Sequence, residues 1–330
     1  ADEQTKQKEG IHSWRKTPAQ MEAELVNMGE HGMNTLNLYV GAPKKTDTGW
    51  DFSTLDMCLG MAQRAGLTRS PFTWLGHNVP FKPDLRPGRE DQNTWDKVMA
   101  LIKDRVTASN DFCREKGYPQ PAFFGEDERS GEALARLKRG YEAVNAAGGI
   151  VTSACYSDYW SNVGTAMTLP ILMGGATSAS SRNAMFHSQA AGLEVWIYNS
   201  PCTNMPATPS TYRRRYGLAM WRNGENGAAP WEYSGTHYRG QGKGGEEGYG
   251  FKPDAPVYAF AFPTWSGKPI DSIIFEAYRE GIYDTRYMAT LEKALAQAKT
   301  KNADPKLMAK VQKWLDNMSV NDDLQKVRRQ

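Results

Sequence analysis

Short apolar runs alternate with amphipathic helical segments along most of this chain, and this alternation limits its fold more than any other feature. Strands that alternate with helices form a parallel sheet with right-handed crossovers. The expected strands are 35–40, 72–75, 121–124, 150–155, 169–173, 193–198 and 227–233. The expected helices are 18–31, 53–65, 94–116, 132–147, 184–191, 211–221 and 271–299.

The fold class that this pattern predicts is α/β, as a (β/α)8 TIM-like barrel. Its first strand is expected to be missing or degenerate, because only the short segment Ile11–Trp14 precedes the first helix. A doubly wound sheet is the alternative, but its glycine-rich phosphate fingerprint is not found, and Gly240–Gly245 reads as a loop. The length of 330 residues suits one barrel domain over residues 1–330, with a C-terminal helical extension from about residue 271.

Composition excludes several classes of protein. With 40% hydrophobic residues, 23% charged residues and a net charge of +3, the chain has no basic stripe that would indicate a nucleic-acid partner. No apolar run approaches the length of about 18 residues that a membrane span needs. The four cysteines and five histidines are scattered, so neither a metal nor another cofactor is expected. Cys58 and Cys113 fit helical patterns and are expected in the core. Disulfides are possible, but the sequence does not indicate them.

Three adjacent acids, Glu126, Asp127 and Glu128, directly follow the expected strand 121–124. At the mouth of a barrel, burial and like charge can raise the pKa of a carboxyl group until it works as an acid near neutral pH. Neighbouring residues of a strand point to opposite faces, so both acids can enter one site only if the backbone turns there. The alternative is a helix N-terminus, where acids are favoured by the helix dipole.

Active sites of (β/α) barrels lie at the carboxyl ends of the strands, and the residues there form the candidate site. They are rich in aromatics, amides and carboxylates, with no serine–histidine–acid arrangement. Aromatic faces stack on the C–H faces of sugars, although core packing is the alternative for each ring. This profile is typical of a carbohydrate site. The residues expected to bind substrate are His77, Asn78, Tyr156, Trp160, Tyr198, Asn199, Trp231, Glu232 and Trp265.

Several segments resemble glycoside hydrolase family 123, the β-N-acetylgalactosaminidases, over about residues 18–291. Phe275–Met288 resembles the "EALREGIEDYEYL" segment that closes the barrel of that family. Val195–Ser200 is similar to its "VWWY" strand, and Tyr216–Glu232 to the helix and strand that follow. Phe124–Glu128 is similar to the strand that ends in an Asp-Glu pair, usually "DEP". This chain departs from the pattern at Arg129, which replaces the proline, and in lacking the preceding β-sandwich domain.

The resemblance implies a retaining glycosidase whose nucleophile is the 2-acetamido group of its substrate. Asp127 would orient that group, and Glu128 would act as general acid and base. Tyr198 would bond the acetamido carbonyl. Apart from the resemblance, Glu126 is expected to point away from the site, toward Arg129. The implied partner is an oligosaccharide or polysaccharide. The family also favours a secreted, periplasmic or cell-surface location, although the chain shows no signal peptide.

Two other hypotheses about the function stay open. An ordinary retaining glycosidase would pair Glu128 with a second carboxylate about 5–5.5 Å away, and Glu232 is the candidate. The strand 193–198 ends in Tyr198 and Asn199 without an acid, which favours substrate assistance instead. A non-catalytic carbohydrate-binding barrel is the third reading, because a cation at Arg129 would lower the pKa of the adjacent acids.

Overall fold

A computed structural model describes residues 17–77, 79–82, 95–198, 208–230, 233, 260–262, 268–301 and 303–319. The chain forms two compact units. The first comprises residues 1–199, 226–231 and 264–269, and the second comprises the remainder. The expected organisation as one domain with an extension from about residue 271 stays a prediction.

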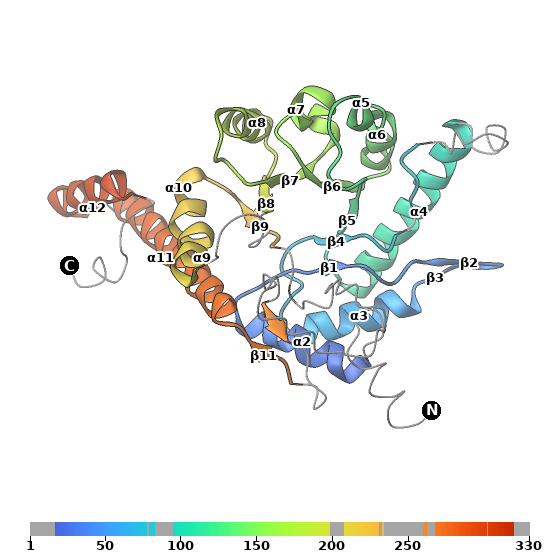
Figure 1. Ribbon diagram of the computed structural model, residues 1–330, viewed down its shortest axis with the longest axis horizontal. Helices are drawn as coiled ribbons and strands as arrows, with labels where there is room; N and C mark the ends of the chain where they lie inside the picture. Colours follow the sequence, from blue (N-terminus) through green and yellow to red (C-terminus); the bar gives the residue numbers. More distant parts are fainter. Residues whose placement is uncertain are drawn as a thin grey trace, which may run out of the picture. The chain divides into compact units, whose positions relative to one another are not determined.

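The first unit is built on a parallel sheet of seven strands whose spatial order equals their order in the chain (Figure 1). All seven lie within the ranges predicted from the apolar runs, so the α/β class of barrel type is confirmed. Within the described residues the sheet is curled and open, with β1 and β9 as its edges. The strands are β1 (Asn37–Leu38), β4 (Phe72–Trp74), β5 (Pro121–Phe124), β6 (Ile150–Cys155), β7 (Leu169–Met173), β8 (Trp196–Tyr198) and β9 (Gly227–Ala228).

Helices cover the outer, convex side of this sheet (Figure 1). The single helix expected over 132–147 is two helices, and α8 begins earlier than expected because the Ser178 side chain caps it, accepting from the Ser181 N–H. The helix α7 and the turn η1 were not predicted. The helices are α2 (Pro18–Glu30), α3 (Ser53–Arg64), α4 (Trp95–Lys116), α5 (Gly131–Ala135), α6 (Lys138–Ala146), α7 (Tyr159–Asn162), η1 (Gly164–Ala166) and α8 (Ala179–Ala190).

A short antiparallel hairpin of β2 (Lys44–Thr46) and β3 (Gly49–Asp51) was also not predicted. Its residues are polar, so no apolar run marks them as strands. Trp50 anchors the hairpin to α4: its indole N–H donates to Asp104, and the guanidinium of Arg105 lies 4.9 Å from its ring centre.

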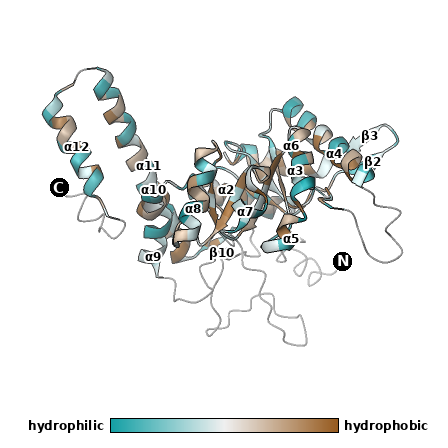
Figure 2. Ribbon diagram, turned by 90° about the horizontal axis from the view of Figure 1, so that it is seen from above, coloured by the Kyte–Doolittle hydropathy of each residue, from teal (hydrophilic) through white to brown (hydrophobic). Residues whose placement is uncertain are grey.

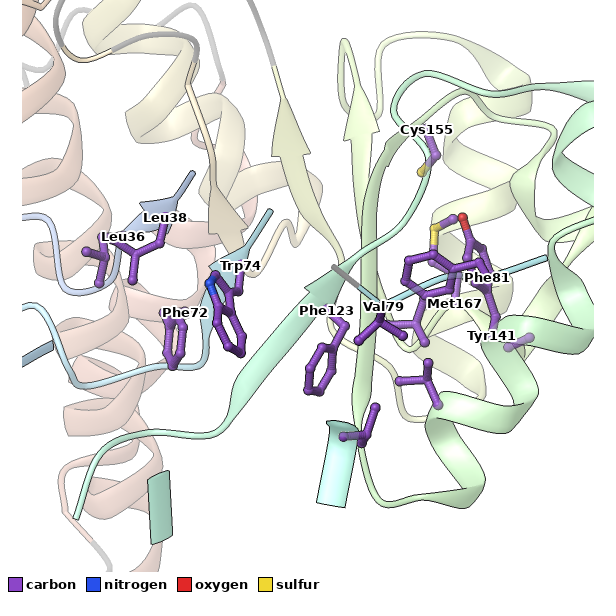
Figure 3. Packing of buried hydrophobic residues seen from close by; sticks show 14 of the residues in the cluster. Leu36, Leu38, Phe72, Trp74, Val79, Phe81, Phe123, Tyr141, Cys155 and Met167 are labelled. Carbon is purple, nitrogen blue, oxygen red and sulfur yellow. The ribbon is translucent and has the colours of Figure 1, made fainter. Parts of the chain in front are cut away.

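The strands bury side chains on both faces of the sheet. Phe123 packs with Trp74 and Tyr141 in the cluster between sheet and helices (Figure 3). Ala122 and Phe124, the next residues on either side, belong to a separate cluster with Ala154, Leu169, Ile171 and Trp196. This alternation is the two-residue period of a strand, and it makes the second cluster the interior of the curled sheet. Cys58 and Cys113 are buried, as predicted.

The second unit consists of helices and one small antiparallel sheet. The helix expected over 211–221 is interrupted by π-helical η2, where Gly217 has non-helical angles (φ −109°, ψ −109°). The helix α12, which carries both hydrophilic and hydrophobic residues (Figure 2), was not predicted. Its Leu315 is buried in a cluster with Leu295 of α11. The elements are α9 (Pro209–Arg214), η2 (Arg215–Ala219), α10 (Met220–Asn223), β10 (Ala261–Phe262), β11 (Ile270–Asp271), α11 (Ile273–Thr300) and α12 (Pro305–Asn317). No described helix of either unit combines the length and hydropathy that a membrane span requires.

The close crossing of η2 and α11 depends on two glycines. A Cβ at Gly281 would lie 2.7 Å from the carbonyl oxygen of Arg213 and 3.1 Å from the amide nitrogen of Gly217. These are backbone atoms, which cannot move aside. Beside the glycines, the carboxylate of Asp284 binds Arg213 in a bidentate pair, with distances of 2.7 and 3.0 Å.

We expect Gly281→Ala to lower the free energy of unfolding by about 1–3 kcal/mol, because the methyl group overpacks this crossing. Gly60→Ala is the matched control, because a Cβ there makes only ordinary contacts, the nearest at 3.5 Å. It should raise stability by up to about 1 kcal/mol through helix propensity. Chemical denaturation of both variants measures the contrast, and equal effects would contradict this account of the crossing.

Candidate active site

The three acids follow β5 at the carboxyl end of the sheet, and the ladder between β5 and β6 is interrupted where they lie. Phe124 is paired with Thr152, and the Gly125 N–H donates to the Thr152 carbonyl at 2.7 Å. The next pairing joins Arg129 to Cys155. Between these two pairings the chain advances five residues from Phe124 to Arg129, but only three residues along β6, from Thr152 to Cys155. The segment after β5 therefore forms a bulge with two extra residues. A bulge re-aims side chains, and this one supplies the turn that two adjacent acids need to share a site.

Glu128 lies in this bulge with a backbone φ of 51°, and it is the one non-glycine residue with positive φ in the described part of the chain. Its N–H donates to the carbonyl of Ala154 at 3.0 Å. The left-handed region is unfavourable for a residue with a Cβ, and such residues cluster at functional sites. The bulge therefore holds the Glu128 carboxylate in a direction that the strand itself would not give.

Glu126 is occupied by two cations. Its carboxylate lies 2.5 Å from the Lys82 ammonium and 3.1 Å from the Arg129 Nε. The prediction that Glu126 points toward Arg129 is confirmed. The pairing also directs the positive charge of Arg129 chiefly to Glu126 rather than to the other two acids.

Asp127 and Glu128 are both exposed. Even so, the pKa of Asp127 is raised, mainly because surrounding protein atoms displace part of its hydration, and next because of the negative charge of Glu128. Arg129 opposes the shift but is its smallest cause. Arg129 was expected to lower the pKa of the adjacent acids. At Asp127 this effect is outweighed by the loss of hydration and by the charge of Glu128.

His77 is not placed to bind a substrate. It is only 4% exposed, its Nδ1 accepts from the Val79 N–H at 2.8 Å, and its Nε2 donates to the Phe124 carbonyl at 2.9 Å. Burial lowers the pKa of the ring to about 4, so the imidazole is neutral. The expectation of a sugar-binding His77 is corrected, because both ring nitrogens are engaged in holding the loop to β5.

The two aromatic candidates after β6 differ. Tyr156 is 41% exposed directly after the strand, where it stays a candidate ligand. Trp160 lies on α7, packs against the core between sheet and helices, and stacks on His187 of α8 at 5.7 Å. Packing on the helical layer accounts for the Trp160 ring, so the alternative reading as a packing residue fits it better.

Tyr198 ends β8 and packs against the interior cluster of the curled sheet, the cluster that contains Phe124. Its carbonyl accepts from the Gly174 N–H at 2.8 Å. Tyr198 stays a candidate ligand, because it lies on the same face of the sheet as Phe124, the last residue of β5 before the acids. Five predicted site residues lie outside the described residues: Asn78, Asn199, Trp231, Glu232 and Trp265.

Several residues that shape the site were not predicted. Gly125 must lack a side chain, because a Cβ there would collide with the hydroxyl of Tyr141. Ser153 bonds a backbone carbonyl of the bulge, Asp158 bonds the Gly131 N–H just beyond it, and Lys82 pairs with Glu126. Of these, only Gly125 carries a sequence signal, as a glycine between a strand and an acid pair.

Comparison with known proteins shows the fold. No protein-family model matches the chain, and no curated protein sequence matches it. The structure of a family 123 glycoside hydrolase from Clostridium perfringens is similar, with a TM-score of 0.59 and 16% identity over 89% of this chain and 57% of that one. The chain thus spans little more than half of that enzyme. A family 10 xylanase from Thermobacillus composti is more distant, with a TM-score of 0.44 and 11% identity over 77% of this chain and 92% of that one.

The left-handed conformation of Glu128 predicts a difference between two variants that both lack its carboxylate. Glu128→Gly should be more stable than Glu128→Ala by about 1 kcal/mol, because only alanine has a Cβ that resists positive φ. The comparison removes the effect of the charge itself. Denaturation midpoints of the two variants measure it, and an alanine variant as stable as the glycine variant would contradict the strain.

The raised pKa of Asp127 predicts a pH-dependent loss of stability. The folded state holds this proton above the ordinary value of 3.8, so the free energy of unfolding falls as pH rises from there through the raised pKa. Asp127→Asn should therefore melt above the parent at neutral pH and match it in acid.

Asp56→Asn is the control of opposite sign. Hydrogen bonds from Lys116 and Tyr118 lower the pKa of Asp56, so this substitution should melt below the parent at neutral pH. Melting curves between acid and neutral pH measure both variants. A parent that matches Asp127→Asn throughout this range would contradict the assignment.

Proposed function

We propose that this chain is a glycoside hydrolase that cleaves β-linked 2-acetamido sugars, of the N-acetylgalactosaminide type, with retention of configuration. The observation that carries the proposal is the bulge after β5, where Asp127 and Glu128 are adjacent at the carboxyl end of a barrel strand. The similar family 123 structure, described for glycolipid glycan hydrolysis, supports a glycan as substrate.

In the first step the acetamido carbonyl oxygen attacks the anomeric carbon while Glu128 gives its proton to the leaving glycosidic oxygen. A cyclic oxazolinium intermediate forms, and the leaving sugar departs with its new hydroxyl. In the second step Glu128 takes a proton from water, and the water oxygen attacks the anomeric carbon and reopens the ring. Two inversions give net retention, and general acid–base catalysis of this kind contributes about 10²–10⁴-fold.

Asp127 acts on the acetamido group. Its carboxylate accepts from the acetamido N–H, which fixes the carbonyl oxygen for attack and stabilises the positive charge of the intermediate. This role needs the ionised form. Because the pKa of Asp127 is raised, the acid limb of kcat/KM lies above the range of a free aspartate.

Two features support this mechanism over the alternatives. The acids are adjacent, which suits a substrate that brings its own nucleophile, whereas an ordinary retaining pair takes its carboxylates from separate positions about 5–5.5 Å apart. The pairing of Arg129 with Glu126 also weighs against a non-catalytic barrel, because Glu126 shares the positive charge of Arg129. The protein needs no metal or other cofactor for these steps.

Substitutions within the acid triplet test the assignment. Glu128→Gln and Asp127→Asn should each lower kcat/KM for an aryl β-N-acetylgalactosaminide by about 100-fold or more. Glu132→Gln is the control and should stay within about fivefold, because it removes only an exposed ion pair with Arg136. The fall in kcat/KM of Glu128→Gln should be smaller for substrates whose aryl group leaves without protonation. Unchanged activity of Glu128→Gln would refute the assignment.

Fluorination of the substrate separates the candidate mechanisms. Replacing acetamido by trifluoroacetamido makes the carbonyl oxygen a weaker nucleophile, so substrate assistance predicts a progressive fall in kcat with each fluorine. A Glu128/Glu232 pair predicts little change, and also turnover of aryl glycosides without the acetamido group. Binding of N-acetyl sugars with no turnover at all would favour the carbohydrate-binding barrel.

A further inference from the structure

The bulge that carries the acids leaves the ladder of β5 and β6, and backbone groups in such a segment need other partners. Side chains from β6 and the turn after it bond two backbone groups here: the Glu126 carbonyl within the bulge, and the Gly131 N–H just beyond it, at the first residue of α5. These contacts lie on either side of Asp127 and Glu128, and neither side chain belongs to the acid triplet.

Ser153 supplies the first contact. It lies on β6, is 1% exposed, and its hydroxyl donates to the Glu126 carbonyl at 2.8 Å and to the Ala154 carbonyl at 3.2 Å. The Glu126 carbonyl belongs to the peptide bond that leads into Asp127. The buried hydroxyl therefore fixes the backbone where the bulge begins.

Asp158 supplies the second contact, from the turn after β6. Its Oδ2 accepts from the Gly131 N–H at 2.7 Å, three residues beyond Glu128. Asn162 holds this carboxylate in turn, donating to Oδ2 at 3.0 Å and to the Asp158 carbonyl at 2.8 Å. Gly131 has a φ of 54°, so the chain turns again at the point that Asp158 binds.

We propose that Ser153 and Asp158 are positioning residues, which hold the acid-bearing bulge from the neighbouring strand so that Asp127 and Glu128 meet the substrate in register. The catalytic part of this inference rests on the proposed function. Small displacements matter here, because about 1 Å away from the productive geometry can cost about 100-fold in rate.

The test uses Ser153→Ala, Asp158→Ala and Asp158→Asn, with Thr168→Ala as the matched control. Thr168 also bonds β6 through its hydroxyl, accepting from the Val151 N–H at 2.8 Å, but at the opposite end of the strand. Asp158→Asn keeps an oxygen that accepts from Gly131. If Asp158→Ala does not fold, Asn162→Ala replaces it, because it removes only the support of Asp158.

The first measurement is hydrogen exchange of the backbone amides from residue 126 to 131, which needs no substrate. Ser153→Ala and Asp158→Ala should exchange about tenfold faster there than the parent, the effect of losing one hydrogen bond. Asp158→Asn and Thr168→Ala should match the parent in this segment. Unchanged exchange in the first two variants would overturn the proposal whatever the activity of the chain.

The second measurement is turnover of the aryl N-acetyl sugar. Ser153→Ala and Asp158→Ala should lower kcat about tenfold or more with KM within about twofold, because binding groups stay while the acids shift. Asp158→Asn should recover most of kcat, and Thr168→Ala should change stability alone. Faster exchange with unchanged kcat would overturn the positioning role. A parent that hydrolyses nothing would instead refute the proposed function, and exchange would still decide whether the two residues hold the bulge.

Discussion

The geometry of the candidate site depends on one interruption of the ladder between β5 and β6. A regular strand sends neighbouring side chains to opposite faces, so Asp127 and Glu128 could not act on the same sugar from it. Two extra residues before the pairing of Arg129 with Cys155 remove that restriction. The consequence is visible at Glu128, whose backbone takes the left-handed conformation. The backbone strain at Glu128, the shifted pairing of Arg129 and the direction of the Glu128 carboxylate thus all result from this bulge.

The charges of the triplet are divided in a way that favours acid–base chemistry. Three adjacent carboxylates repel one another, but Glu126 is bound by Lys82 and Arg129. Asp127 and Glu128 are exposed, and lost hydration together with the like charge of Glu128 raises the pKa of Asp127. Arg129, which departs from the family's proline, therefore acts mainly on the one acid that the proposed mechanism does not use.

The sequence predicts the strands well and the site only in part. Apolar runs located all seven strands, and the five central ones, β4 to β8, are buried along most of their length. Two of the candidate rings are engaged elsewhere, since a residue after a strand can turn back into the core: Trp160 packs on the helical layer, and His77 bonds the Phe124 carbonyl. Ser153 and Asp158 could not be found at all, because their partners are backbone groups that no residue type specifies.

The segment that most resembles family 123, Phe275–Met288, has a structural explanation that involves no chemistry. Its Gly281 allows the close approach of η2, and Asp284 binds Arg213. Thr285 donates toward the Tyr216 and Gly217 carbonyls of the π-helical turn. A match in this segment therefore reports a helix crossing. Because a crossing can persist in a chain that has lost its activity, hydrolysis depends on the bulge at Asp127 and Glu128 instead.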